Sequence, residues 1–242
     1  MGPTCSWGVV DLSPESLDSG GVIRSAAGAL ARIVPAAVMR YGRDGPGTTA
    51  LLVVLLVAHG WLVHSVEAGQ VLGWASTNTD NLARHPLASL AGSLLFFDGT
   101  VTRAGSVITL GFGVAGALWW LEARRGLPRA ATVFLAGHVG ATLLTAAVIT
   151  AAVRAGRYPV ELRYALDFGI SYGAETALAA VTLAMPWWAW PPWTLFVLGW
   201  PIVDAEWYGL LPDFTTVGHL ISAAIGFALG VLLVRARGSV RL

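Results

Sequence analysis

The stretch Phe214–Val234, FTTVGHLISAAIGFALGVLLV, decides the fold expected of this chain. It contains no acid and no arginine, and it supplies the roughly 20 residues that a helix needs to cross a bilayer. One histidine, His219, interrupts it near its start. Small residues recur at every fourth position, which lets a neighbouring helix approach closely. These residues are Gly218, Ser222, Gly226 and Gly230. The stretch therefore predicts a membrane-spanning helix that packs tightly against a partner helix.

The composition of the chain also indicates a membrane protein. Of its 242 residues, 55% are hydrophobic and 12% are charged, and the mean hydropathy is +0.66. A soluble domain carries about 25% charged residues. The net charge of +1 gives no reason to expect a nucleic-acid partner. The single cysteine, Cys5, excludes an intrachain disulfide and a multi-cysteine metal site, and we expect no metal and no cofactor.

Six apolar stretches predict an all-α membrane protein with six transmembrane helices. They are Thr49–Val66, Ala104–Leu121, Ala131–Val153, Ala165–Met185, Trp193–Leu211 and Phe214–Val234. The apolar segment Pro86–Phe97 is too short to cross, so we expect an interfacial or re-entrant piece in the first loop. Before the first span, Val22–Arg40 has one apolar face and fits an amphipathic helix on the membrane surface.

The arginines predict the orientation of the chain. All 15 basic residues are arginines, which indicates a GC-rich genome, and we expect a bacterial one. With six spans, ten arginines share a side with both termini and five lie opposite, so both termini are expected in the cytoplasm, below the bacterial inner membrane. The predicted organisation is a cytoplasmic segment over residues 1–48, a membrane domain over 49–236 and a short basic tail over 237–242.

A serine and a histidine are expected at matching depth near the outer face. Ser171 lies in Gly169-Ile170-Ser171-Tyr172 of the fourth stretch, and His219 lies in the sixth. Counting helical rise puts each roughly 7–9 Å below its helix start. A serine hydroxyl becomes a nucleophile when an imidazole takes its proton. The alternative is helix packing without chemistry, because Gly169, Gly173 and Ala177 also form a small-residue stripe.

These features together resemble the rhomboid family of intramembrane proteases, in its divergent rhomboid-like branch. The resemblance covers roughly residues 49 to 236. It rests on the order of the spans, the apolar first loop, Leu121-Glu122 with Gly126 and Arg129, the Gly-x-Ser of the fourth span and the histidine of the sixth. It implies that Ser171 is the nucleophile and His219 the general base. It also implies a bundle in which Gly173, Ser222 and Gly226 serve helix packing.

Two departures from the family pattern bear on activity. The resemblance implies a histidine and an asparagine on the second span that help to bind the oxyanion, whereas Ser106 and Leu110 occupy those positions here, next to Thr109. Ser106, Thr109 and backbone amides around Gly169 are the candidate replacements. The Trp-Arg pair of the family's first loop is replaced by Arg84-His85-Pro86.

Three further polar residues form a possible network. Asp167 precedes Ser171 by one helical turn and either orients it or complements the helix dipole. Glu175 is a mid-membrane acid, which is a functional candidate by default or else a hydrogen-bonded carboxyl inside the bundle. His138, expected roughly 15 Å in depth from Ser171, could reach Glu175.

Two functions of different classes follow from these observations. The first is serine-type proteolysis of a transmembrane protein substrate near the outer face. The second is a non-catalytic rhomboid relative that binds transmembrane helices of a client as an adaptor or quality-control factor. The bilayer is the common partner in both, and the sequence leaves the oligomeric state open.

Overall fold

The computed structural model describes residues 34–97 and 104–238 of the chain, with side chains described as far as Leu233. The chain divides into two compact units, Met1–Arg43 and Asp44–Leu242. In the first unit, residues 34–43 are described and they are helical. The amphipathic helix expected over Val22–Arg40 lies largely outside the described residues, so its place on the membrane surface stays a prediction.

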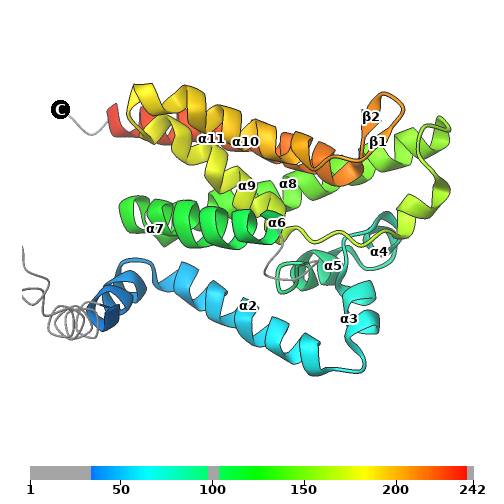
Figure 1. The fold of residues 1–242 in the computed structure, drawn as a ribbon, viewed down its shortest axis with the longest axis horizontal. Helices are drawn as coiled ribbons and strands as arrows, with labels where there is room; N and C mark the ends of the chain where they lie inside the picture. The colour runs from blue at the N-terminus through cyan, green and yellow to red at the C-terminus, as the bar shows by residue number, and fades with distance from the viewer. Residues whose placement is uncertain (1–33, 98–103, 239–242) are drawn as a thin grey trace, which may run out of the picture. The chain divides into compact units, whose positions relative to one another are not determined.

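The described part of the second unit is almost entirely helical (Figure 1). Its longer helices are α2 (Pro46–His64), η2 (Val107–Leu118), α8 (Leu127–Arg154), α9 (Ile170–Val181), α10 (Trp190–Val203) and α11 (Phe214–Gly238). Its shorter helices are α3 (Ala68–Ala75), α4 (Thr79–Arg84), α5 (Pro86–Gly92), α6 (Ala104–Ser106), α7 (Trp119–Arg125), η3 (Val160–Tyr164), η4 (Thr182–Ala184) and η5 (Trp187–Ala189). The strands β1 (Trp207–Tyr208) and β2 (Leu211–Pro212) pair antiparallel in a small hairpin.

Among the described residues, four helices are long and apolar enough to cross a membrane, which confirms a multi-pass membrane protein. They are Pro46–His64, the continuous helix Ala104–Arg125, Leu127–Arg154 and Phe214–Leu233. The helices α9 and α10 have 12 and 14 residues, fewer than the roughly 20 needed to cross. The arrangement with six spans therefore stays a prediction.

The centre of the unit is α9. Every residue from Ile170 to Val181 is buried except Ser171, which is partly exposed. The helix packs against α8, α11 and η2, and Figure 1 shows it among the neighbouring helices. A short helix of this kind needs no lipid-facing surface, because the longer helices enclose it.

Close packing around α9 depends on small residues of its neighbours. A Cβ added to Gly113 of η2 would lie 2.6 Å from the Cβ of Ala174, and one added to Gly226 of α11 would lie 2.6 Å from the Cβ of Ala179. Real Cβ atoms do not come this close. The η2 segment is also a run of π-helix, a wide form that rarely exceeds a single turn.

The predicted bounds of two spans are wrong. The fourth was expected over Ala165–Met185, but helix begins only at Ile170 and ends in a 3₁₀ turn before Pro186, which disfavours helix in the residue ahead of it. The fifth was expected to end at Leu211, but α10 ends at Val203 and is followed by the hairpin. A positive φ of 67° at Gly209 shapes that hairpin.

The first loop contains three short helices, α3, α4 and α5. The last of them begins at Pro86, where the sequence predicted an apolar segment too short to cross. Its Ser89 and Gly92 are buried, and a Cβ at Gly92 would lie 3.1 Å from Ala75 of α3. The loop is therefore a packed substructure that covers part of the bundle.

Candidate functional site

A cavity of about 270 Å³ lies where η2, α9, α10 and α11 meet. Its polar lining comes from residues far apart in the sequence, which are Ser106, Thr109, Asp167, Ser171, Asp204, Thr215 and His219. Trp200, Phe97, Leu110 and Phe168 supply apolar walls. Both members of the predicted Ser-His pair thus line one cavity together with two hydroxyl-bearing residues of the second span.

Ser171 lies in the first turn of α9, at the N-terminal end of the helix. The sequence had placed it a turn and a half inside, because the helix was expected to begin five residues earlier. Its Oγ donates a hydrogen bond to the carbonyl of Phe168 at 3.3 Å. The hydroxyl is therefore held by its own turn.

A polar network in the first loop holds the chain just ahead of Ser171. The hydroxyl of Ser76 accepts a hydrogen bond from the backbone N–H of Asp167 at 2.9 Å. The Thr77 N–H and hydroxyl both donate to the Asp167 carbonyl, at 2.9 and 3.0 Å. These bonds satisfy backbone groups in an extended segment between η3 and α9, and so they set where α9 can begin.

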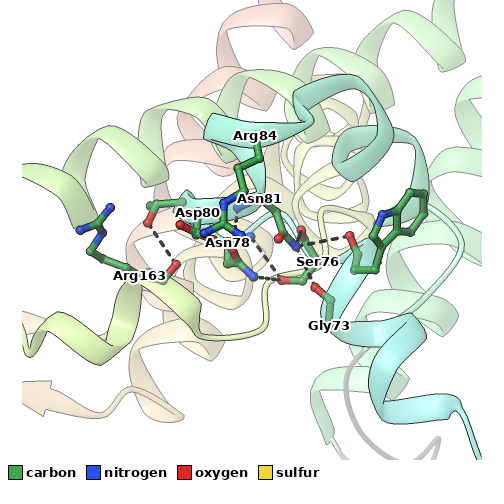
Figure 2. A network of polar contacts seen from close by, with 9 residues as sticks. Gly73, Ser76, Asn78, Asp80, Asn81, Arg84 and Arg163 are labelled. Carbon is green, nitrogen blue, oxygen red and sulfur yellow. Dashed lines mark hydrogen bonds and ion pairs between the residues drawn. The ribbon is translucent and has the colours of Figure 1, made fainter.

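Figure 2 shows how Ser76 is itself held in place. The side-chain amide of Asn81 donates to the carbonyls of Ser76 and Gly73 at 2.9 and 2.7 Å. Asn78 caps α4 through its side-chain oxygen, which accepts from the Asn81 N–H at 2.9 Å. The first loop thus holds the segment that leads into Ser171 through a network of hydrogen bonds.

His219 lies on α11, one turn after its start, and is 5% exposed. Its ring is edge-on to Tyr172 of α9 at 5.3 Å and to Trp200 of α10 at 4.7 Å. The backbone of Gly218 leaves the space that the Tyr172 ring fills. The imidazole Nε2 is buried and has no hydrogen-bond partner among the described residues.

Ser171 and His219 therefore share a cavity without a hydrogen bond between them. The serine hydroxyl is bonded to Phe168, and the imidazole Nε2 is left with an empty acceptor or donor position. A buried polar atom without a partner is costly, and such atoms cluster where function requires them.

A comparison with families of known proteins gives a match over most of the chain. A family model described as rhomboid-like protein matches residues 40–240. The chain belongs to this rhomboid-like family. No curated protein and no solved structure matches it.

The three residues of the predicted polar network have separate partners in this rhomboid-like protein. Asp167 is held through its backbone by the first loop. Glu175 accepts a hydrogen bond from the indole N–H of Trp200 at 2.9 Å. The Nε2 of His138 is 2.9 Å from the carbonyl of Leu90 in α5.

The depth of His138 differs from the sequence estimate. Its ring fills the space beside Gly169, one residue before α9 begins. The estimate of roughly 15 Å placed the end of the third span and the start of the fourth at the same level, whereas α8 extends to Arg154 and α9 begins beside the middle of α8. His138 thus lies near Ser171 in depth, but it serves the contact between α5, α8 and α9.

The small residues predicted to pack helices contact different neighbours. Gly226 faces Thr176 and Ala179 of α9, and the Ser222 carbonyl accepts from the Thr176 hydroxyl at 3.0 Å. Gly173, however, lies against the Phe134 ring of α8. The stripe of α11 thus meets α9, whereas Gly173 of α9 meets α8.

Trp200 is the residue of the rhomboid-like site that sequence reasoning missed. It lines the cavity, contacts the His219 ring and binds Glu175. A buried acid in a membrane helix needs a hydrogen-bond donor, and the indole N–H groups of the nearby tryptophan-rich helix were candidates for that donor in the sequence.

Within residues 34–97 and 104–238, no group of three or more His, Cys, Asp or Glu could hold a metal ion.

Proposed function

We propose that this rhomboid-like protein is an intramembrane serine endopeptidase of the bacterial inner membrane, with Ser171 as nucleophile and His219 as general base. The observation that carries the proposal is the shared cavity, into which Ser171, His219, Ser106 and Thr109 all open. The unpartnered Nε2 of His219 is available as a proton acceptor.

The reaction follows from these positions. The Ser171 Oγ leaves the Phe168 carbonyl and attacks the substrate carbonyl carbon, while its proton passes to His219 Nε2. The resulting oxyanion is stabilised by hydroxyl donors of Ser106 and Thr109 and by backbone N–H groups at the start of α9. The C–N bond then breaks and the amine leaves with the proton from His219. In the second half of the reaction, water gives a proton to His219 and attacks the acyl-enzyme ester, and Ser171 leaves with the proton from His219.

An apolar groove supports the access of a transmembrane substrate. A cleft of about 590 Å³ lies between α6 and η2 on one side and α10 on the other. It is lined by Ile108, Leu195, Phe196 and Val203, and it shares Gly105, Trp200 and Asp204 with the cavity of Ser171. A helix in the lipid could reach the serine along this path once it unwinds, so we expect substrates with small, helix-breaking residues near the outer face.

Labelling with a fluorophosphonate probe in proteoliposomes tests the proposal. We expect wild-type protein to label at Ser171, and Ser171→Ala and His219→Ala to lose labelling by about 10³-fold or more. Ser65→Ala is the matched control, since Ser65 lies at the end of α2 and bonds to the Glu67 N–H. It should label like wild type.

Cleavage of a transmembrane reporter completes the test. Ser171-dependent cleavage supports the peptidase. Saturable binding of a transmembrane segment without probe labelling and without cleavage would refute it and establish the non-catalytic adaptor instead.

A further inference from the structure

The hydrogen bond between Glu175 and Trp200 joins α9 to α10 directly behind the candidate base. The Trp200 indole N–H donates to Glu175 Oε2 at 2.9 Å. The same indole ring lies 4.7 Å from the His219 ring, with an angle of 61° between the ring planes. One side chain of α9 thus fixes a ring that contacts α11.

Burying the carboxyl group of Glu175 costs free energy, and packing alone does not explain why an acid stands at this position. Glu175 is 1% exposed, and its second oxygen, Oε1, has no hydrogen-bond partner within the described part of the chain. Replacing a buried, incompletely bonded carboxyl by an apolar group of similar volume is often neutral or stabilising. Glu175 is therefore a poor choice for stability, and its one hydrogen bond points to a role in holding Trp200.

Trp200 occupies a position where three spaces meet. It lines the cavity of Ser171, the apolar groove between η2 and α10, and a third cleft of about 350 Å³ that also contains His219. Trp200 itself is only half-buried. Without its bond to Glu175 the indole would be free to turn toward the groove between η2 and α10. The imidazole would then lose one of its two aromatic contacts.

We infer that Glu175 is a positioning residue, which holds the Trp200 indole against His219 and thereby keeps the imidazole aimed into the cavity of Ser171. The catalytic consequence rests on the proposed function, but the positioning itself does not. Tyr172 makes a second ring contact, so the imidazole meets one aromatic ring from α9 and one from α10.

Chemical acylation of His219 by diethyl pyrocarbonate measures this positioning without any catalysis. The rate is followed by mass spectrometry of the peptide that carries His219, in folded protein in detergent. We expect Glu175→Leu and Trp200→Phe each to raise the rate about fivefold or more, because the first removes the bond that holds the indole beside the buried ring and the second removes the indole with that bond. Glu175→Gln keeps an oxygen acceptor and should stay within about twofold of wild type.

Two comparisons separate positioning from general loosening of the bundle. Trp193→Phe removes a matched indole bond between the same two helices, since Trp193 Nε1 donates to the Leu178 carbonyl at 2.9 Å away from His219. It should leave the acylation rate of His219 unchanged. The double variant of Glu175→Leu with Trp200→Phe should match either single variant, because both break one bond.

Probe labelling of Ser171 gives the catalytic readout in the same variants. We expect it to fall about tenfold in Glu175→Leu and Trp200→Phe and to be restored in Glu175→Gln, because small errors in the position of a base are costly. Unchanged acylation of His219 in both variants, or an equal rise in Trp193→Phe, would overturn the inference. Should wild type not label at all, the proposed peptidase fails while the acylation series still decides the role of Glu175.

Discussion

Replacing Gly226 by alanine tests whether α11 must approach α9 as closely as the structure has it. The added Cβ would lie 2.6 Å from the Cβ of Ala179 and would also meet the backbone carbonyl of Thr176. Ordinary van der Waals contacts lie at 3.4–4 Å, so the helices must separate by about 1 Å at this point. The obstacle is backbone, which has no rotamer to change. We therefore expect a loss of about 1–3 kcal/mol in the free energy of unfolding.

The matched control is Gly60→Ala in α2. Gly60 is exposed on a helix and has no atom within 4 Å of an added Cβ, so this variant reports helix propensity alone. We expect it to gain up to about 1 kcal/mol. Both free energies can be measured by reversible denaturation in mixed micelles, followed by circular dichroism. Equal or greater stability of Gly226→Ala than of wild type would refute the close approach of α11 to α9.

Three further outcomes are expected. Glu122→Ala should lower the free energy of unfolding by about 2–4 kcal/mol, because its buried carboxylate accepts three hydrogen bonds from the first turn of α2; a loss below 1 kcal/mol contradicts this. Burial raises the pKa of Tyr158, whose hydroxyl donates to the Pro212 carbonyl, so its contribution to stability is present below about pH 10 and lost as the pH rises further. The decrease in melting temperature above about pH 10 should thus be smaller in Tyr158→Phe than in wild type. An identical decrease in both proteins would argue against a stabilising role of the Tyr158 hydroxyl. Ser106→Ala should slow probe labelling of Ser171 about tenfold or more if its hydroxyl stabilises the oxyanion, and an unchanged rate excludes that role.

The sequence was most informative where a helix is long and uniformly apolar. The predicted sixth span begins at Phe214, as α11 does, and the third differs from α8 by four residues or fewer at either end. The reason is physical, because a run of this length without charges can satisfy its backbone in lipid only as a helix. The segment Pro86–Phe97 was expected to be an interfacial or re-entrant piece because it is too short to cross, and its first part forms the short helix α5.

The sequence failed where contacts between distant residues decide the local structure. Residues 165–169 are apolar enough to continue α9 toward its N-terminus, yet they are not helical, and the Ser76 and Thr77 hydroxyls bind the Asp167 backbone instead. Those bonds join residues about ninety positions apart, and no local pattern announces them. The pairing of Glu175 with Trp200 was missed for the same reason, since it depends on how α10 lies against α9.

The short length of α9 bears on how water reaches a serine inside a membrane protein. At 1.5 Å per residue, its 12 residues span about 18 Å, less than the hydrocarbon core of about 30 Å. Gly169 lies beside His138, which is about 24 Å along α8 from its end at Arg154. Ser171 therefore lies deeper in the bundle than the Arg154 end of α8. The segment that connects this end to α9 passes through η3 and is held by hydrogen bonds from the first loop. A polar cavity at the start of a short, enclosed helix gives water and an unwound peptide the same place to meet, and the hydrolysis proposed at Ser171 requires both.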